Sequence, residues 1–176
     1  MIPVRKESDE VLYPSSAKID FAVADVERLK RMADNNPRGR VRLCVHDSPK
    51  SIVHEMIIVH RNDCYVRPHC HMNRDESVHI IEGSADLIVF DSVGEVRSVV
   101  ELGDMSSGGT FFCKIVAKTI HMLLFKSPHL VFKEVTQGPF DPDAVFFPDW
   151  APAEGDPQLP QFLDGLRTLL SRRKEG

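Results

Sequence analysis

The feature that most constrains the fold is a succession of short β-prone segments after Gly39, with turns and no helical segments between them. Turn-forming residues punctuate the chain, as in Asp47-Ser48-Pro49 and Ser106-Ser107-Gly108-Gly109. Many short strands at near-regular spacing are typical of an antiparallel sandwich or barrel. We therefore predict an all-β fold, with strands over residues 41–46, 53–60, 64–71, 77–82, 85–90, 95–101, 111–116, 121–126 and 130–135.

Two helices are predicted outside this region. Apolar residues recur at helical spacing between Asp20 and Asp34, and Asp20 is the expected N-cap. A second amphipathic pattern predicts a helix from Leu159 to Arg173. Residues 137–157 are rich in proline, aspartate and aromatic residues, which indicates an ordered tail laid over the barrel. We expect one domain overall: an N-terminal arm and helix (1–39), a barrel (40–136), and a C-terminal tail with a short helix (137–176).

Composition excludes several classes of protein. The net charge of −4 gives no basic excess for binding nucleic acid. Apolar runs such as Met56-Ile57-Ile58-Val59 are far shorter than the ~20 residues of a membrane-spanning helix. The N-terminal residues lack the apolar stretch of a secretory signal, and no two of the four cysteines form a CxxC pair. We therefore expect a cytoplasmic protein with reduced thiols, no nucleic-acid partner and no membrane association.

The chemistry is concentrated around two histidines separated by one residue. His69 and His71 share one face of a strand, so both can bind the same ion. Glu76 follows after a short turn and can present its carboxylate to the same point. Imidazole and carboxylate ligands suit a divalent transition metal. His121 opens a later strand, and it is the candidate for a fourth ligand.

These residues resemble the motifs of the cupin superfamily. In the first cupin motif, two such histidines are followed by a glutamate and then a glycine, and His69, His71, Glu76 and Gly83 occupy those positions. His121 stands where the second motif has its histidine. The second motif is otherwise degraded, because the places of its proline, glycine and asparagine are taken by Val116, Lys118 and Phe125.

A closer resemblance is to the WbuC-type cupin fold metalloproteins, over roughly residues 20–156. This resemblance implies a cupin jelly-roll (double-stranded β-helix) barrel that holds one divalent metal ion (Zn, Fe, Mn or Ni) through His69, His71, Glu76 and His121. Members are associated with bacterial surface-polysaccharide clusters. The matching strings are Val66-Arg67-Pro68-His69-Cys70-His71, Asp75-Glu76-Ser77, His79-Ile80-Ile81-Glu82-Gly83, Val131-Phe132-Lys133-Glu134-Val135 and Trp150-Ala151-Pro152-Ala153-Glu154-Gly155-Asp156.

Strand alternation suggests two further site residues. Arg67 shares a face with His69, so it either binds an anionic part of a ligand or packs its stem and extends its head to solvent. If Lys133 faces water, Glu134 points inward, where a carboxylate needs a partner. Glu134 then either pairs with Arg67 or acts as a general base beside the metal.

We expect the metal to act as a Lewis acid on a small anionic or sugar-type metabolite linked to bacterial surface-polysaccharide synthesis. An isomerase- or epimerase-like reaction would use Glu134 as the base. Two alternatives stay open: an Fe(II)-dependent oxygenase, and a non-enzymatic module that only binds a small-molecule ligand such as a sugar derivative. A homodimer is compatible with outer strands that need covering.

Overall fold

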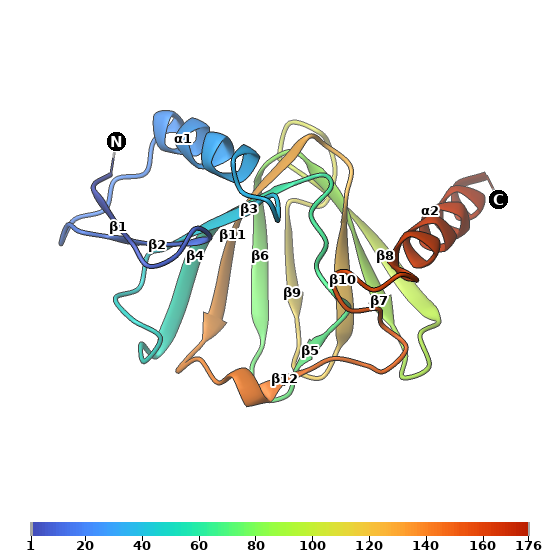
Figure 1. The fold of residues 1–176 in the computed structure, drawn as a ribbon. Coiled ribbons are helices and arrows are strands. Elements are labelled where there is room, and N and C mark those ends of the chain that lie inside the picture. Colours follow the sequence, from blue (N-terminus) through green and yellow to red (C-terminus); the bar gives the residue numbers. More distant parts are fainter. Residues whose placement is uncertain (1, 176) are drawn as a thin grey trace.

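The computed structural model describes residues 2–175, and these residues form a mostly β structure with one helix near each end (Figure 1). The elements are β1 (Val4–Lys6), β2 (Val11–Pro14), α1 (Val23–Asp34), β3 (Arg40–Cys44), β4 (Val53–Arg61), β5 (Cys70–His71), β6 (Glu76–Glu82), β7 (Ser84–Phe90), β8 (Val96–Gly103), β9 (Phe112–Ile115), β10 (Ile120–Phe125), β11 (His129–Gln137), a 3-10 turn (Pro142–Ala144), β12 (Val145–Phe146) and α2 (Leu159–Glu175).

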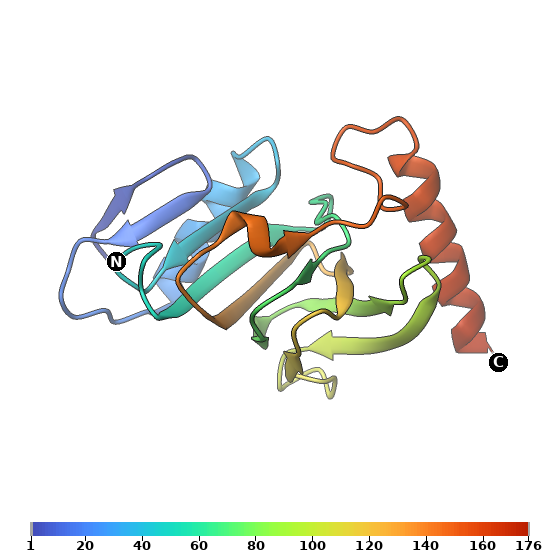
Figure 2. The ribbon, with the colours of Figure 1, turned by 90° about the horizontal axis from the view of Figure 1, so that it is seen from below.

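The described strands form three sheets. The largest has the order β1-β2-β3-β4-β11-β6-β9, the second has the order β10-β7-β8, and β12 pairs with β5. All neighbours are antiparallel except β2 and β3. Figure 2 shows the chain after β11, in orange, crossing between the two larger sheets toward α2. The N-terminal arm before α1 thus extends the largest sheet through β1 and β2.

Alternation along β4 and β11 separates the inside of the molecule from the outside. Val131 of β11 packs under α1 with other buried residues of the sheet. Its neighbour Phe132 belongs to the core between the sheets, and Glu134 lines the same interior. Lys133, between them, forms an ion pair with Glu55 of β4. Side chains of alternating direction therefore give this sheet one face for α1 and one for the interior.

The helix α1 covers the outer face of the largest sheet, where Val26, Leu29 and Ala33 are buried. The predicted N-cap is wrong: the helix begins after Ala22, not after Asp20. Asp25 supplies the missing acceptor, because its carboxylate accepts from the backbone N of Ala22 at 3.1 Å. An acidic side chain in the first turn can thus satisfy a free backbone N–H without a polar N-cap residue.

The helix α2 covers the outer face of the β10-β7-β8 sheet. Leu166 and Leu170 are buried there against Ile88, Phe90 and other residues of that sheet. This helix extends to Glu175, slightly beyond the predicted end. Two helices on opposite outer faces leave the space between the sheets to the functional residues.

Two predictions about the strands differ from the structure. Residues 64–71 form strand only at Cys70–His71, because Pro68 interrupts the ladder and the segment before it is extended without a partner. Between residues 2 and 175, single bridges rather than continuous ladders connect the three sheets: His69, next to β5, pairs with His121 of β10, and Leu102 of β8 pairs with Thr110, just before β9. Over this described part of the chain, the prediction of a mostly β fold with a helix near each end is confirmed, whereas the strands do not close into a barrel.

Candidate functional site

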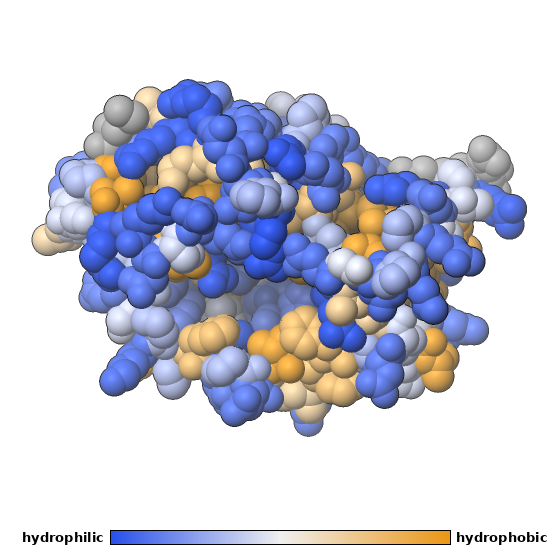
Figure 3. All heavy atoms as spheres, in the orientation of Figure 1, coloured by the Kyte–Doolittle hydropathy of each residue, from blue (hydrophilic) through white to orange (hydrophobic). Residues whose placement is uncertain are grey.

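A cavity of about 810 Å³ lies between the two larger sheets. In Figure 3 the visible face is hollowed near its centre, and hydrophobic residues gather below the hollow, over β5 and β12. Core side chains such as Phe132 line one part of the cavity. Its polar lining includes all of the predicted site residues, namely Arg67, His69, His71, Glu76, His121 and Glu134.

The backbone brings His69 and His121 together from distant parts of the sequence. The backbone N of His69 donates to the carbonyl O of His121 at 3.1 Å, and the reverse bond is 2.9 Å. The two imidazole centroids are 4.8 Å apart. His71, two residues further along, has its ring centroid 5.2 Å from that of His69. The first and second histidine motifs are therefore joined by a direct backbone bridge.

The carboxylate of Glu76 lies between two of these imidazoles. Its Oε1 is 2.7 Å from Nε2 of His121, and its Oε2 is 3.0 Å from Nε2 of His71. Burial alone would raise the pKa of Glu76, but the hydrogen bonds from His121 and His71 outweigh it and hold the pKa below its usual range. Burial likewise opposes the charged form of His121, yet the bond to Glu76 raises the pKa of that imidazole. Glu76 is thus a buried anion held by imidazole N–H groups.

Backbone carbonyl groups orient two of the imidazoles by hydrogen bonding to their Nδ1 atoms. Nδ1 of His69 is 2.9 Å from the carbonyl O of Arg67, and Nδ1 of His121 is 2.8 Å from that of Thr119. A carbonyl only accepts, so each Nδ1 carries a proton and Nε2 is the atom turned to the site. Burial lowers the pKa of His69 to about 4, which keeps its Nε2 lone pair free near neutral pH. Such carbonyl contacts are the usual second layer around metal-binding histidines.

The donor set of three imidazoles and one carboxylate fits the predicted divalent metal in its chemistry. Among residues 2–175, however, no group of three or more His, Cys, Asp and Glu side chains is arranged as a metal site. The contacts of Glu76 explain this, because its oxygens bond directly to Nε2 of His71 and His121 instead of sharing an ion with them. The metal and its four ligands therefore stay a prediction.

Glu134 of β11 lies deep in the cavity. Burial, and then the negative charge of Glu76, raise the pKa of Glu134 to about 8. Within the described chain its side chain has no ion pair with Arg67, so the pairing alternative is not formed. A carboxyl group with a pKa near neutrality can both accept and donate a proton, as a general base requires.

Arg67 holds the C-terminal tail against the cavity wall. Its Nε donates to the carbonyl O of Ala151 at 2.9 Å, and its Nη2 donates to that of Pro148 at 3.3 Å. The guanidinium also lies over the ring of Phe147, 5.2 Å from its centroid. Arg67 thus lines the cavity, with two of its nitrogen atoms already bonded to backbone.

Arg74 is a residue of the site that sequence reasoning missed. It lies in the turn between β5 and β6, where strand alternation predicts no direction, and it is only 8% exposed. Its Nη2 is 3.2 Å from Nδ1 of His71, and its guanidinium lies 5.4 Å from the ring centroid of Phe140. A guanidinium only donates, so this Nδ1 is unprotonated and Nε2 of His71 carries the proton. Metal binding through that Nε2 requires the contact with Arg74 to end.

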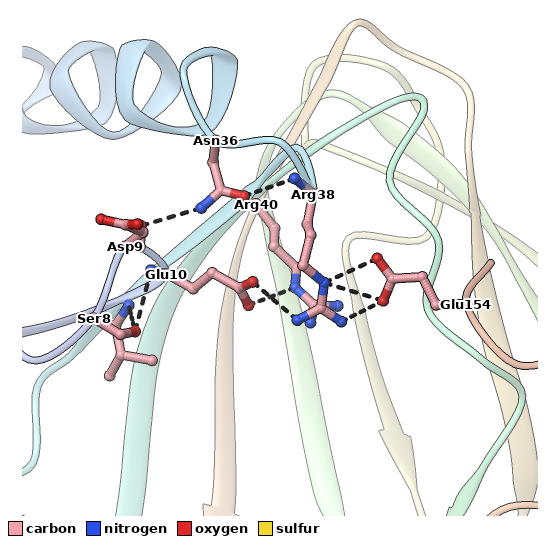
Figure 4. Close-up of polar contacts among 8 residues, drawn as sticks. Ser8, Asp9, Glu10, Asn36, Arg38, Arg40 and Glu154 are labelled. Carbon is pink, nitrogen blue, oxygen red and sulfur yellow. Dashed lines mark hydrogen bonds and ion pairs between the residues drawn. The ribbon is translucent and has the colours of Figure 1, made fainter.

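A charged network, also not predicted, joins distant segments beside the cavity (Figure 4). Arg38 donates from Nη1 to Glu10 at 2.9 Å and from Nε to Glu154 at 2.9 Å. Nε of Arg40 donates to the other oxygen of Glu10 at 2.7 Å. All four residues line the cavity. The network therefore connects the N-terminal arm, the start of β3 and the C-terminal tail at one end of the interior.

The chain is structurally similar to cupin-fold proteins. The capsular polysaccharide assembling protein CapF from Staphylococcus aureus superposes with a TM-score of 0.51 at 13% identity, over 64% of this chain and 31% of that one. Protein SO0799 from Shewanella oneidensis gives a TM-score of 0.47 at 14% identity, over 58% of this chain and 66% of that one. The chain thus spans less than a third of CapF and about two thirds of SO0799.

Comparisons at the level of sequence are less informative. Residues 21–102 match a family described as a domain of unknown function (DUF6016). No curated protein matches the chain. No helix within residues 2–175 is long and apolar enough to cross a membrane. The comparisons therefore support a cupin-like fold, and the function has to be argued from the site.

Proposed function

We propose that this protein is a metal-binding cupin of the WbuC type, with a jelly-roll architecture, that acts on a small anionic or sugar-type metabolite. The observation that carries the proposal is the meeting of His69, His71, Glu76 and His121 in the wall of one cavity, with two imidazoles oriented by backbone carbonyls. These four residues would hold one divalent ion of Zn, Fe, Mn or Ni. The bound ion would supply Lewis acidity to a ligand in the cavity.

The residues around this centre have distinct proposed roles. Glu134 is the candidate to move a proton at a ligand atom, since its half-buried side chain lines the cavity and has no ion-pair partner among the described residues. Arg67 contacts the ligand from the tail side of the cavity, while its backbone bonds position Pro148 and Ala151. Isomerases and epimerases remove a proton from a carbon next to a carbonyl group and return a proton to the substrate.

The proposed substrate class rests on two supports. The cavity combines cationic and aromatic side chains, including Arg67 over Phe147, which suits a ligand with both an anionic group and a less polar body. The resemblance to WbuC-type proteins and the structural similarity to a capsular polysaccharide assembling protein favour a sugar derivative of surface-polysaccharide synthesis.

Metal content tests the proposal directly. The protein would be purified without oxygen and analysed for bound metals, together with the variants His71→Ala and His79→Ala. His79 is an exposed histidine on β6, so it is a matched control for removing one imidazole. We expect stoichiometric metal in the wild type and in His79→Ala, and a loss in His71→Ala. Equal metal content in the wild type and His71→Ala would exclude this centre.

A further inference from the structure

Arg74 is a buried cation that forms no ion pair in the described part of the chain, and the nearby Glu134 carboxyl group keeps its proton near neutral pH. Its one hydrogen bond goes to the neutral ring of His71, and its Nε is buried without any partner. The ring of Phe140 beneath the guanidinium supplies a weak attraction but no countercharge. Burying a charge without a partner is costly, so a buried and unpaired guanidinium in a cavity wall indicates an anion that comes from outside the chain.

The turn that carries Arg74 is held rigidly by its neighbour Asp75. One oxygen of the Asp75 carboxylate accepts from the backbone N of Ala117 at 2.9 Å, and the other pairs with Lys114 at 2.7 Å. The backbone of Asp75 is held by β11, where the hydroxyl of Thr136 donates to its carbonyl O at 2.7 Å. The backbone of the turn that carries Arg74 is thus held in place before any ligand arrives, and such preorganisation lowers the entropic cost of binding.

From these contacts we infer that Arg74 anchors a carboxylate group of the small molecule held in the cavity. The inference deepens the proposed function and rests on the same cavity being its ligand site. The planar guanidinium matches the two oxygens of a carboxylate. Arg67 is less suited to this task, because its Nε and Nη2 already donate to backbone carbonyls.

The charges around Arg74 favour a carboxylate over a phosphate. Glu76 and Glu134 line the same cavity, and one unpaired guanidinium balances one negative charge. A phosphate near neutral pH carries more than one negative charge, and the charge that Arg74 does not balance would be repelled by the carboxylate of Glu76. His71 is in contact with Arg74, so a carboxylate held there lies next to the proposed metal ligands.

The test uses NMR of the intact chain after removal of metals with a chelator, so that no ion can bind the probe. The Nε–H signal of Arg74 would be assigned from the variant Arg74→Lys and followed during addition of acetate, inorganic phosphate or chloride. We expect a saturable shift with acetate and little response to chloride. In Arg74→Gln, acetate affinity, followed through backbone amide signals, should fall by at least about tenfold, the equivalent of one charge-assisted hydrogen bond.

The variant Arg97→Gln is the matched control, since Arg97 is exposed on β8 and pairs with Asp91. Acetate binding that is unchanged in Arg74→Gln, or a wild-type Arg74 signal that does not respond, would overturn the inference. Tighter binding of phosphate than of acetate would overturn the assignment to carboxylates. Metal analysis of the wild-type protein as purified, before the chelator is added, separates the two proposals: absence of metal with acetate binding that depends on Arg74 refutes only the metal centre.

Discussion

Replacing Glu134 by glutamine is expected to stabilise the protein at alkaline pH and to leave its stability nearly unchanged at acidic pH. Glutamine has the size of a protonated glutamate but cannot ionise. Burial and the charge of Glu76 raise the pKa of Glu134 from 4.5 to about 8 in the folded chain. The folded state therefore keeps a proton that the unfolded state releases, and wild-type stability falls as the pH rises between these two values.

The size of the effect follows from the two pKa values. Each pH unit between them costs about 1.36 kcal/mol, so the full interval sets an upper limit of about 5 kcal/mol. The penalty is absent below about pH 4.5, grows through neutrality and is complete above about pH 8. We expect Glu134→Gln to exceed the wild type by about 2–5 kcal/mol near pH 9.

Denaturant unfolding, followed by circular dichroism between about pH 5 and pH 9 with a chelator present, measures this difference. Groups that do not interact with Glu134 also titrate over this range, and their contributions cancel between the wild type and the variant. Glu95→Gln is the control, because Glu95 is exposed and is not among the residues that line the cavity. Parallel stability curves for the wild type and Glu134→Gln would refute the buried, partnerless state of this carboxyl group.

Three further substitutions test the fold by the same unfolding measurement. Gly83→Ala should cost about 2–4 kcal/mol, because Gly83 has φ +88° and an added Cβ would lie 2.3 Å from a backbone oxygen; a neutral result would contradict this turn. Phe132→Ala should cost about 3–5 kcal/mol, because Phe132 is 2% exposed at the centre of the core; a loss below about 1 kcal/mol would show that it is not packed there. Lys118→Gly should stabilise by about 1 kcal/mol, because Lys118 has φ +67°; a loss of stability would show that the lysine side chain matters more than its backbone.

The strands could be predicted because their signals are local. Alternation and turn residues identify β4, β6, β7 and β11 to within about two residues. The segment 64–71 misled the prediction, since apolar content alone does not show whether a neighbouring strand is available for pairing. Sheet order and barrel closure depend on contacts between distant segments, which no local pattern encodes.

For the candidate site too, residues with a local sequence signal could be predicted, and residues placed by contacts between distant segments could not. His69, His71 and Glu76 are close in sequence, and their common face follows from strand geometry. Arg74 was not predicted as a site residue, because side chains in a turn do not alternate in direction as they do in a strand. Its place three residues after His71 was only a weak signal of proximity to the site. Ion pairs between segments far apart in the sequence, such as Arg38 with Glu154, leave no sequence pattern at all.

The turn before His121 shows how a motif can be lost in sequence and kept in structure. Lys118 stands where the cupin motif has a glycine, yet its backbone adopts the left-handed conformation, with φ +67°, that glycine favours. Its N–H donates to the carbonyl O of His71 at 2.7 Å, which secures the turn against the first motif. The conformation is thus imposed by its surroundings at a cost of about 1–2 kcal/mol. Because that contact and the His69–His121 bridge hold the turn from both sides, His121 reaches the site without the glycine.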